Sequence, residues 1–204
     1  MSQTHSRLVQ LATASDAECR TKAMEILREG DGLVSRDTAL YVSVTVADCL
    51  PIYLLDSESG AFAVLHSGWK GTGIVKAALD LMKKQWNTRP VAVSAILGPC
   101  IRSCCYAVDE ERARCFEEEF GLHSKSHGLK GAEFPLGPVV RRSEGQSYID
   151  LQAANARLLA SEGISDLSYC ENCTFTDTRL GSFRREGSEA FTRMLAFAGN
   201  LSQE

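Results

Sequence analysis

The sequence predicts an α+β fold in a single domain, residues 1–204, in which mixed β-sheets are flanked by helices. Segments rich in β-branched residues alternate irregularly with segments of helical periodicity, so the strict strand–helix repeat of a doubly wound sheet is missing. The chain has 204 residues, which fits one hydrophobic core or at most two tightly packed lobes. Apolar residues make up 44% of it, enough to build that core.

Seven short apolar segments are expected to form strands because they are rich in β-branched residues or bounded by turn signals. They are residues 7–12, 39–46, 51–55, 61–65, 91–97, 167–170 and 191–197. The sequence DSESG lies between the third and fourth of these and is typical of a turn. We therefore expect the second, third and fourth strands to form an antiparallel meander.

Four segments have the apolar spacing of one-faced helices. The first, 16–29, begins at a capping Asp16 and is closed by Gly30. The others are 71–86, 109–120 with acidic residues in its first turn, and 150–162, which ends at Gly163. Residues 121–147 are rich in Gly, Ser and Lys and are expected to form a long loop.

Charge and hydropathy exclude several classes of function. The net charge is −4 and no cluster of Lys and Arg is longer than two, so a nucleic-acid partner is not expected. No apolar stretch approaches the roughly 20 residues of a membrane span, and the first ten residues are too polar for a secretory signal. We expect a cytoplasmic protein whose eight cysteines are free thiols rather than a disulfide framework.

Cys49 and His66 stand where two predicted strands end, beside glycines that let a ligand approach the backbone. If the two strands pair through the DSESG turn, both side chains reach one edge of the sheet. A thiolate and an imidazole suit either a Zn²⁺ site or a Cys–His nucleophile pair. The alternative is a buried small Cys49 and a hydrogen-bonded core histidine. Asp48 and the pair Trp69–Lys70 favour a functional site.

Five separated motifs resemble the YfiH-like laccase-domain family. They are TVADCLP at 45–51, HSGWKG at 66–71, LGPCIRSCCYAV at 97–108, CT at 173–174 and SFRR at 182–185. The family pattern is TADCxP, HAGWRG, GPxIxxCCYEV, CT and SYRR in the same order, so the resemblance covers nearly the whole chain. It implies a YfiH-like fold.

The resemblance also implies a metal site. The family takes a histidine from a QxHG motif, which QTHS matches here, so His5, Cys49 and His66 are the implied ligands. One thiolate and two imidazoles leave tetrahedral Zn²⁺ with an open position; copper is less favoured. Catalytic roles are implied for Cys49, His66, Lys70 and Arg184, and contacts to substrate or phosphate for Lys70, Gly71, Arg184 and Arg185.

Three positions depart from the family pattern. Ser6 replaces the glycine of QxHG, Lys70 replaces an arginine, and Ala107 replaces a glutamate. Lys70 keeps the positive charge but loses the bidentate fork of arginine. The family also carries some tens of residues before the first histidine, whereas His5 stands near the start of this sequence.

The implied activity is zinc-dependent phosphorolysis of a purine nucleoside, in which adenosine or inosine and phosphate give the base and ribose-1-phosphate. Adenosine deamination and methylthioadenosine cleavage are implied as further activities. Three alternatives stay open: a cysteine-type hydrolase or amidase acting on peptidoglycan precursors, a copper-dependent polyphenol oxidase, and a metal-stabilised module without turnover. The oxidase is disfavoured because laccase chemistry needs several coppers and the chain has four histidines.

Other reactive residues have less specific patterns. A second metal site that combines Cys100, Cys104 and Cys105 with the pair Cys170 and Cys173 is conceivable, but core and pocket-wall cysteines are favoured. His123 and His127 are expected to be solvated. Arg193 resembles an arginine near the end of the family pattern, and Trp69 is assigned to the core rather than to substrate stacking.

Overall fold

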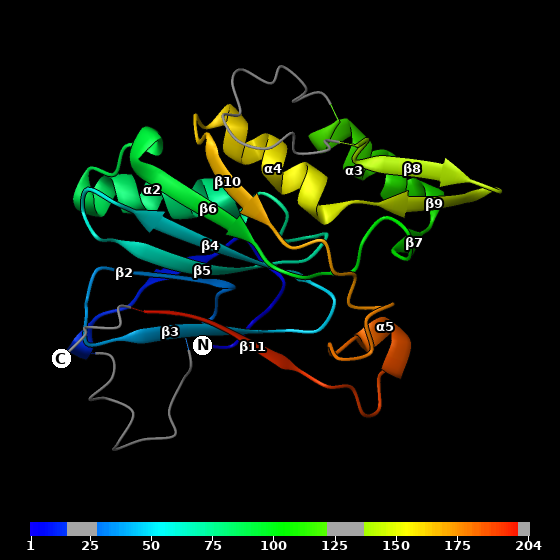
Figure 1. Ribbon diagram of the computed structural model, residues 1–204, viewed down its shortest axis with the longest axis horizontal. Helices are drawn as coiled ribbons and strands as arrows, with labels where there is room; N and C mark the ends of the chain where they lie inside the picture. The colour runs from blue at the N-terminus through cyan, green and yellow to red at the C-terminus, as the bar shows by residue number, and fades with distance from the viewer. Residues whose placement is uncertain (16–27, 122–136, 200–204) are drawn as a thin grey trace.

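The computed structural model describes residues 1–15, 28–121 and 137–199, which form three layers (Figure 1). A mixed six-stranded sheet lies in the middle. Helices α2 (Ile74–Trp86) and α4 (Leu151–Ser161) lie over one of its faces, and a two-stranded sheet lies against the other. The predicted α+β class with mixed sheets and flanking helices is therefore confirmed.

The central sheet has the order β1 (Val9–Leu11), β2 (Gly32–Ser35), β5 (Phe62–Ser67), β4 (Leu50–Asp56), β6 (Val93–Leu97) and β10 (Asp166–Tyr169). The two outer pairs, β1 with β2 and β6 with β10, are parallel, and the inner pairs are antiparallel. The hairpin of β4 and β5 follows the DSESG prediction. Asp56 closes its turn by accepting from the hydroxyl of Ser59 at 2.6 Å.

The expected three-strand meander is wrong in its first strand. β3 (Tyr41–Val46) leaves the central sheet and pairs antiparallel with β11 (Met194–Gly199). Its burial alternates strictly, because Val42, Val44 and Val46 face the central sheet and the residues between them face solvent. That alternation identifies a half-buried strand but carries no information about which strand lies beside it.

The long loop expected over 121–147 is wrong at its C-terminal end. β8 (Val140–Ser143) and β9 (Gln146–Ile149) form a hairpin there, and β7 (Ala107–Val108) adds a third strand. Glu144 and Gly145 form its turn with φ of 53° and 76°, the positive values that a type I′ turn requires. Residues 122–136, with His123 and His127, lie outside the described part, as does most of the helix expected at 16–29.

Three predicted helices are confirmed. α2 matches the apolar face expected over 71–86, α3 (Glu110–Phe120) begins after Asp109, and α4 begins after Asp150. Each aspartate caps its helix by accepting a backbone N–H, from Arg112 and Ala153 respectively. Two shorter helical elements, a 3₁₀ turn at Pro90–Ala92 and α5 at Phe183–Glu186, were not predicted, and neither was strand β2. None of the described helices combines the length and apolarity needed to cross a lipid bilayer.

The core has two parts, one on each face of the central sheet. The larger part lies between the sheet and the helices, and the smaller one lies between β5 and the β3–β11 pair. All six residues of β5 are buried because that strand is covered on both sides. His66 therefore belongs to a strand that packing holds firmly from both faces.

We expect Leu54 and Leu55 to differ sharply in their contribution to stability, because they are neighbours on β4 that face opposite sides of the sheet. Leu54 is 2% exposed and Leu55 is 51% exposed. Leu54→Ala should lower the free energy of unfolding by about 2–5 kcal/mol, whereas Leu55→Ala should change it by less than about 0.5 kcal/mol. Urea unfolding of both variants measures this, and equal losses would contradict the described burial.

Candidate metal centre

The register of the β4–β5 hairpin brings Cys49 and His66 together. Pro51 pairs with His66 and Leu50 with Ser67, so Cys49, directly before β4, lies opposite Gly68. Asp48 has a φ of 84°, and this left-handed turn redirects the chain as it enters the strand. A cysteine and a histidine that are 17 positions apart in the sequence thus reach the same end of the sheet, as the hairpin predicts.

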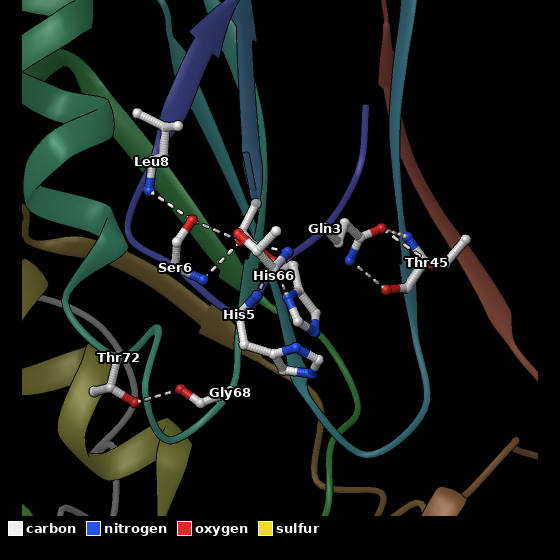
Figure 2. Close-up of polar contacts among 10 residues, drawn as sticks. Gln3, His5, Ser6, Leu8, Thr45, His66, Gly68 and Thr72 are labelled. Carbon is white, nitrogen blue, oxygen red and sulfur yellow. Dashed lines mark hydrogen bonds and ion pairs between the residues drawn. The ribbon is translucent and has the colours of Figure 1, made fainter. Parts of the chain in front are cut away.

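His5 reaches the same point from the N-terminal segment. Its ring lies edge-on to that of His66, with centroids 4.9 Å apart, and Figure 2 shows the two rings side by side. Gln3 fixes the segment to β3: its amide accepts from the backbone N–H of Thr45 at 2.7 Å and donates to the Thr45 carbonyl at 2.9 Å. These contacts hold the N-terminal segment against strand β3.

The ligand atoms of His5, Cys49 and His66 all lie within 4.8 Å of one another. His5 is exposed, Cys49 is half-buried and His66 is buried, so the cluster opens to solvent on the His5 side. Zinc binds thiolate at about 2.3 Å and imidazole at about 2.0–2.1 Å, and one ion can reach three ligand atoms at this spacing after small side-chain adjustments. The donor set fits a metal with one open coordination position.

Asp31 organises this cluster through a fully buried carboxylate. Nδ1 of His66 lies 2.8 Å from its Oδ1, which leaves Nε2 of His66 to face the cluster. The backbone N–H groups of Thr4, His5 and Ser6 all donate to the same carboxylate, at 3.1, 3.0 and 2.7 Å. One side chain therefore orients His66 and shapes the loop that carries His5, a pattern common around metal-ligating histidines.

Ser6, which replaces the glycine of the family pattern, adds to this network. Its hydroxyl donates to Asp31 at 2.8 Å and accepts from the backbone N–H of Leu8 at 3.2 Å (Figure 2). The departure from glycine therefore supplies a further hydrogen bond to Asp31.

The charges of the cluster are strongly coupled. Burial alone would raise the pKa of Cys49, but hydrogen bonds with His5 and His66 outweigh it and lower that pKa to about 7. Burial would lower the pKa of His66, but its contacts with Asp31 and Cys49 raise it to about 9. Burial likewise opposes ionisation of Asp31, yet its hydrogen bonds hold its pKa well below the usual range. Without metal the site therefore favours a thiolate beside an imidazolium.

Two glycines of the HSGWKG segment make room for the cluster. A Cβ at Gly68 would lie 2.9 Å from Sγ of Cys49 and 3.4 Å from Cδ2 of His5. A Cβ at Gly71 would lie 3.0 Å from the carbonyl oxygen of Ser6. The hydroxyl of Thr72 donates to the Gly68 carbonyl at 2.9 Å and fixes the turn between them. Side chains at these two positions would push apart the segments that meet here.

Asp48 joins three of the sequence motifs. Its carboxylate accepts from the hydroxyl of Thr174 at 2.6 Å and from the backbone N–H of Arg184 at 2.7 Å. These bonds anchor the CT and SFRR segments beside Cys49. The guanidinium of Arg184 donates to the Ala107 carbonyl at 3.0 Å and lies 5.4 Å from the ring centroid of Tyr106.

Aromatic and cationic side chains gather around the cluster. Burial raises the pKa of Tyr106 and the charge of Cys49 adds to this, while Arg184 and Arg112 oppose it, so the phenol stays protonated at neutral pH. Arg112 lies 4.6 Å and Lys70 5.7 Å from the ring of Trp69. Trp69 is partly buried and packs against the larger core, where the sequence had assigned it.

The predicted phosphate-contacting residues differ in their placement. Lys70 is exposed, whereas the Gly71–Gly73 turn is buried and Gly73 is covered by the guanidinium of Arg7.

The guanidinium of Arg185 has many partners within the protein. It donates to the carbonyl oxygens of Thr174, Phe175, Asp177 and Leu180 and to the carboxylate of Glu186. These hydrogen bonds stabilise the loop that carries the CT motif.

Asp31, Gly68 and Tyr106 belong to the candidate site, and the sequence did not single them out. Asp31 lies in the sequence GDG directly before β2, and an aspartate at the start of a buried strand was the available signal. Tyr106 follows the paired cysteines of the GPCIRSCCYAV motif. None of the three belongs to the His5–Cys49–His66 group of possible ligands, so a search of the sequence for that group does not find them.

The chain also matches known proteins. The family described as multi-copper polyphenol oxidoreductase laccase matches residues 1–200. An adenosine deaminase designated RL5, from an unknown prokaryotic organism, is 33% identical over 88% of this chain and 68% of its own length. A purine nucleoside phosphorylase of Clostridium acetobutylicum is 31% identical over 97% of this chain and 74% of its own.

The fold has close counterparts among solved structures. The crystal structure of YlmD from Geobacillus stearothermophilus superimposes with a TM-score of 0.80 at 29% identity, covering 97% of this chain and 71% of that one. The central mixed sheet with its candidate metal centre is thus that of a laccase-like domain. The chain belongs to the multi-copper polyphenol oxidoreductase laccase family, whose relatives include proteins named purine nucleoside phosphorylase and adenosine deaminase.

Replacement of Asp31 by asparagine should lower the pKa of His66. The contact with Asp31 helps to raise that pKa to about 9, so an uncharged partner removes the attraction for the imidazolium. Metal-free protein in the presence of a chelator can be titrated by NMR of its four histidine rings. Wild-type His66 should stay protonated through neutral pH, while the variant should lose its proton at lower pH.

Asp37→Asn is the matched control, because that aspartate caps a turn by accepting from the N–H of Ala39 and is not part of the cluster. Its His66 titration should match the wild type. A His66 pKa that is the same in all three proteins would contradict the role given to Asp31.

Proposed function

We propose that the chain is a metal-dependent purine nucleoside phosphorylase in which His5, Cys49 and His66 hold the metal. The observation that carries the proposal is the convergence of the three ligand atoms within 4.8 Å. It occurs in a chain that is about 30% identical to several relatives named purine nucleoside phosphorylase. The substrates would be a purine nucleoside such as adenosine or inosine, together with inorganic phosphate.

Zinc is the metal we propose for this site. One thiolate, two imidazoles and an open position form the ligand set of a catalytic zinc site. Oxidation of phenols by a laccase needs several coppers, and two of the four histidines in the sequence are already placed in this cluster. When bound, zinc would supply a Lewis acid that polarises an oxygen of the substrate or of water.

The protein's own groups would bind and orient the reactants. Asp31 would keep His66 in one tautomer and orientation through the contact at Nδ1. Lys70 and Arg184 would attract the phosphate, since one is an exposed cation and the other lies at Tyr106 beside the cluster. Tyr106, which keeps its proton, would donate a hydrogen bond to a substrate oxygen or ring nitrogen. We leave Arg185 out of the phosphate site because its guanidinium already has five partners.

A cysteine-type hydrolase is the second candidate. It is favoured by one observation: hydrogen bonds with His5 and His66 lower the pKa of Cys49 to about 7, as a nucleophilic thiol requires. In that reaction Cys49 would attack an acyl carbon and His66 would return the proton to the leaving group. Such an enzyme would work without phosphate, which separates the two proposals.

Release of base from adenosine should rise with phosphate concentration and saturate, because phosphate is the attacking group in phosphorolysis. The measurement is chromatography of adenine, inosine and ribose-1-phosphate after incubation of zinc-loaded protein with adenosine. A hydrolase or a deaminase would not respond to phosphate, and an oxidase would consume oxygen and respond to copper. Adenine release that is independent of phosphate would overturn the phosphorylase proposal.

Lys70→Ala should raise the apparent KM for phosphate roughly tenfold, the value of one charge-assisted hydrogen bond, with little change in the KM for adenosine. Lys84→Ala, at an exposed lysine in the last turn of α2, is the matched control and should leave both constants unchanged. Equal weakening of both substrates by Lys70→Ala would indicate a damaged site and count against a phosphate contact.

Cys49→Ala should abolish activity and lower the affinity for zinc by 10-fold or more, because it removes the only thiolate from the His5–Cys49–His66 cluster. The fold should survive, since Cys49 stands at a strand end outside the main apolar cluster. Zinc affinity from chelator competition and a thermal melt measure the two effects, in protein that also carries Cys104→Ser and Cys105→Ser so that the second group of cysteines does not contribute. Cys115→Ala, at an exposed cysteine of α3, is the control. Wild-type turnover in Cys49→Ala would exclude both the zinc and the nucleophile proposals.

A further inference from the structure

A second group of metal-ligating side chains lies apart from the first. The sulfur atoms of Cys104, Cys105 and Cys173 all lie within 4.8 Å of one another, and those of Cys104 and Cys105 are 3.3 Å apart. All three are free thiols; Cys104 is exposed, Cys105 is half-buried and Cys173 is buried. The sequence offered these cysteines as a conceivable metal site but gave no pairing for them.

The three cysteines meet because two loops leave the central sheet side by side. β6 and β10 are parallel neighbours, so the segments that follow them emerge at the same edge. The loops stay together beyond the strands: Cys100 and Cys173 form a parallel bridge, and the N–H of Thr174 donates to the Cys100 carbonyl at 3.1 Å. A tight turn, in which the N–H groups of Cys105 and Tyr106 both donate to the Arg102 carbonyl, then directs the cysteine pair towards Cys173.

Polar contacts hold the cluster in place. Sγ of Cys173 accepts from the backbone N–H of Arg102 at 3.4 Å, a contact that stabilises a thiolate. The guanidinium of Arg102 donates to the carbonyl of Glu171 at 3.3 Å and ties its own loop to that of Cys173. The guanidinium of Arg141 donates to the Ser103 carbonyl at 3.0 Å and so stabilises the turn that carries Cys104 and Cys105. Such outer contacts orient metal ligands and support their negative charge.

The cluster is open to ions from solvent. Cys104 and Cys173 lie in the wall of a cavity of about 580 Å³, together with Arg102, Glu171, Asn172 and Asp177. None of His5, Cys49 and His66 lies in that wall. A cation can therefore reach the three thiols without passing through the first cluster.

We propose that Cys104, Cys105 and Cys173 form a second cation site, specific for thiophilic ions of the Zn²⁺ and Cu⁺ class. Three soft sulfur ligands favour such ions over Mg²⁺ or Ca²⁺, which prefer oxygen. Binding transfers the thiol protons to solvent and involves no change of oxidation state. The proposal does not rest on the phosphorylase activity, because the site uses none of the residues assigned to the reaction.

The second site would stabilise the first from outside. Thr174 follows Cys173 directly and donates its hydroxyl to Asp48, which precedes Cys49. A cation at Cys173 would therefore hold the loop that anchors Asp48 beside the candidate metal centre. Its role is to support the loop rather than to take part in the reaction.

Cobalt(II) binding to the Cys49→Ala variant tests the proposal, because the first cluster then has no sulfur. After reduction and removal of metal, the variant is titrated with Co²⁺ and the thiolate-to-cobalt charge-transfer absorption is recorded. We expect the band to appear and to saturate at one cobalt per chain. Further replacement of Cys104 and Cys105 by serine should remove it, whereas Cys115→Ser should leave it intact.

Competition with Zn²⁺ and with Cu⁺ should displace cobalt and bleach the band, whereas Mg²⁺ should not. Where the double serine variant does not fold, Cys104→Ser at the exposed position should raise the cobalt concentration that gives half of the band, because only two thiolates remain to hold the ion. Absence of the band in Cys49→Ala, or its persistence after Cys104 and Cys105 are both replaced, would overturn the proposal.

Discussion

The carboxylate of Asp31 is the interaction on which the candidate site depends. A buried charge is costly unless it is paired and hydrogen-bonded. Here its partners are the ring of His66 and the donors of residues 4–6. The same contacts that offset the cost of burying Asp31 therefore set the orientation of one proposed ligand and the position of another.

The register of the central sheet places Asp31 next to its partners. β2 pairs with β5 so that Gly32 lies opposite Leu65, which places Asp31 beside His66. The hairpin of β4 and β5 then sets Cys49 opposite Gly68, where the missing side chain leaves room for the sulfur. Because β5 is buried on both faces, a shift in its register would cost core packing as well as the site. Stability of the fold and geometry of the site are thus linked through one strand.

Local patterns predicted the parts of the structure that depend on local chemistry. The turn DSESG, the helices that begin near Asp109 and Asp150 and the apolar face of α2 were all visible in the sequence. The proximity of Cys49 and His66 followed from the hairpin. The pairing of β3 with β11 did not, because alternation marks a face but not a partner. Asp31 was missed for a similar reason: its role arises from contacts with residues more than 20 positions away.

X-ray absorption at the zinc edge tests the central claim most directly, because it reports the atoms bound to the metal. The protein for this measurement carries Cys104→Ser and Cys105→Ser, so that the second cluster does not contribute, and holds one zinc per chain. We expect one sulfur at about 2.3 Å and two imidazole nitrogens at about 2.0 Å, with one lighter ligand in the open position. A zinc shell without sulfur, or one with two or more sulfurs, would contradict a centre built from His5, Cys49 and His66.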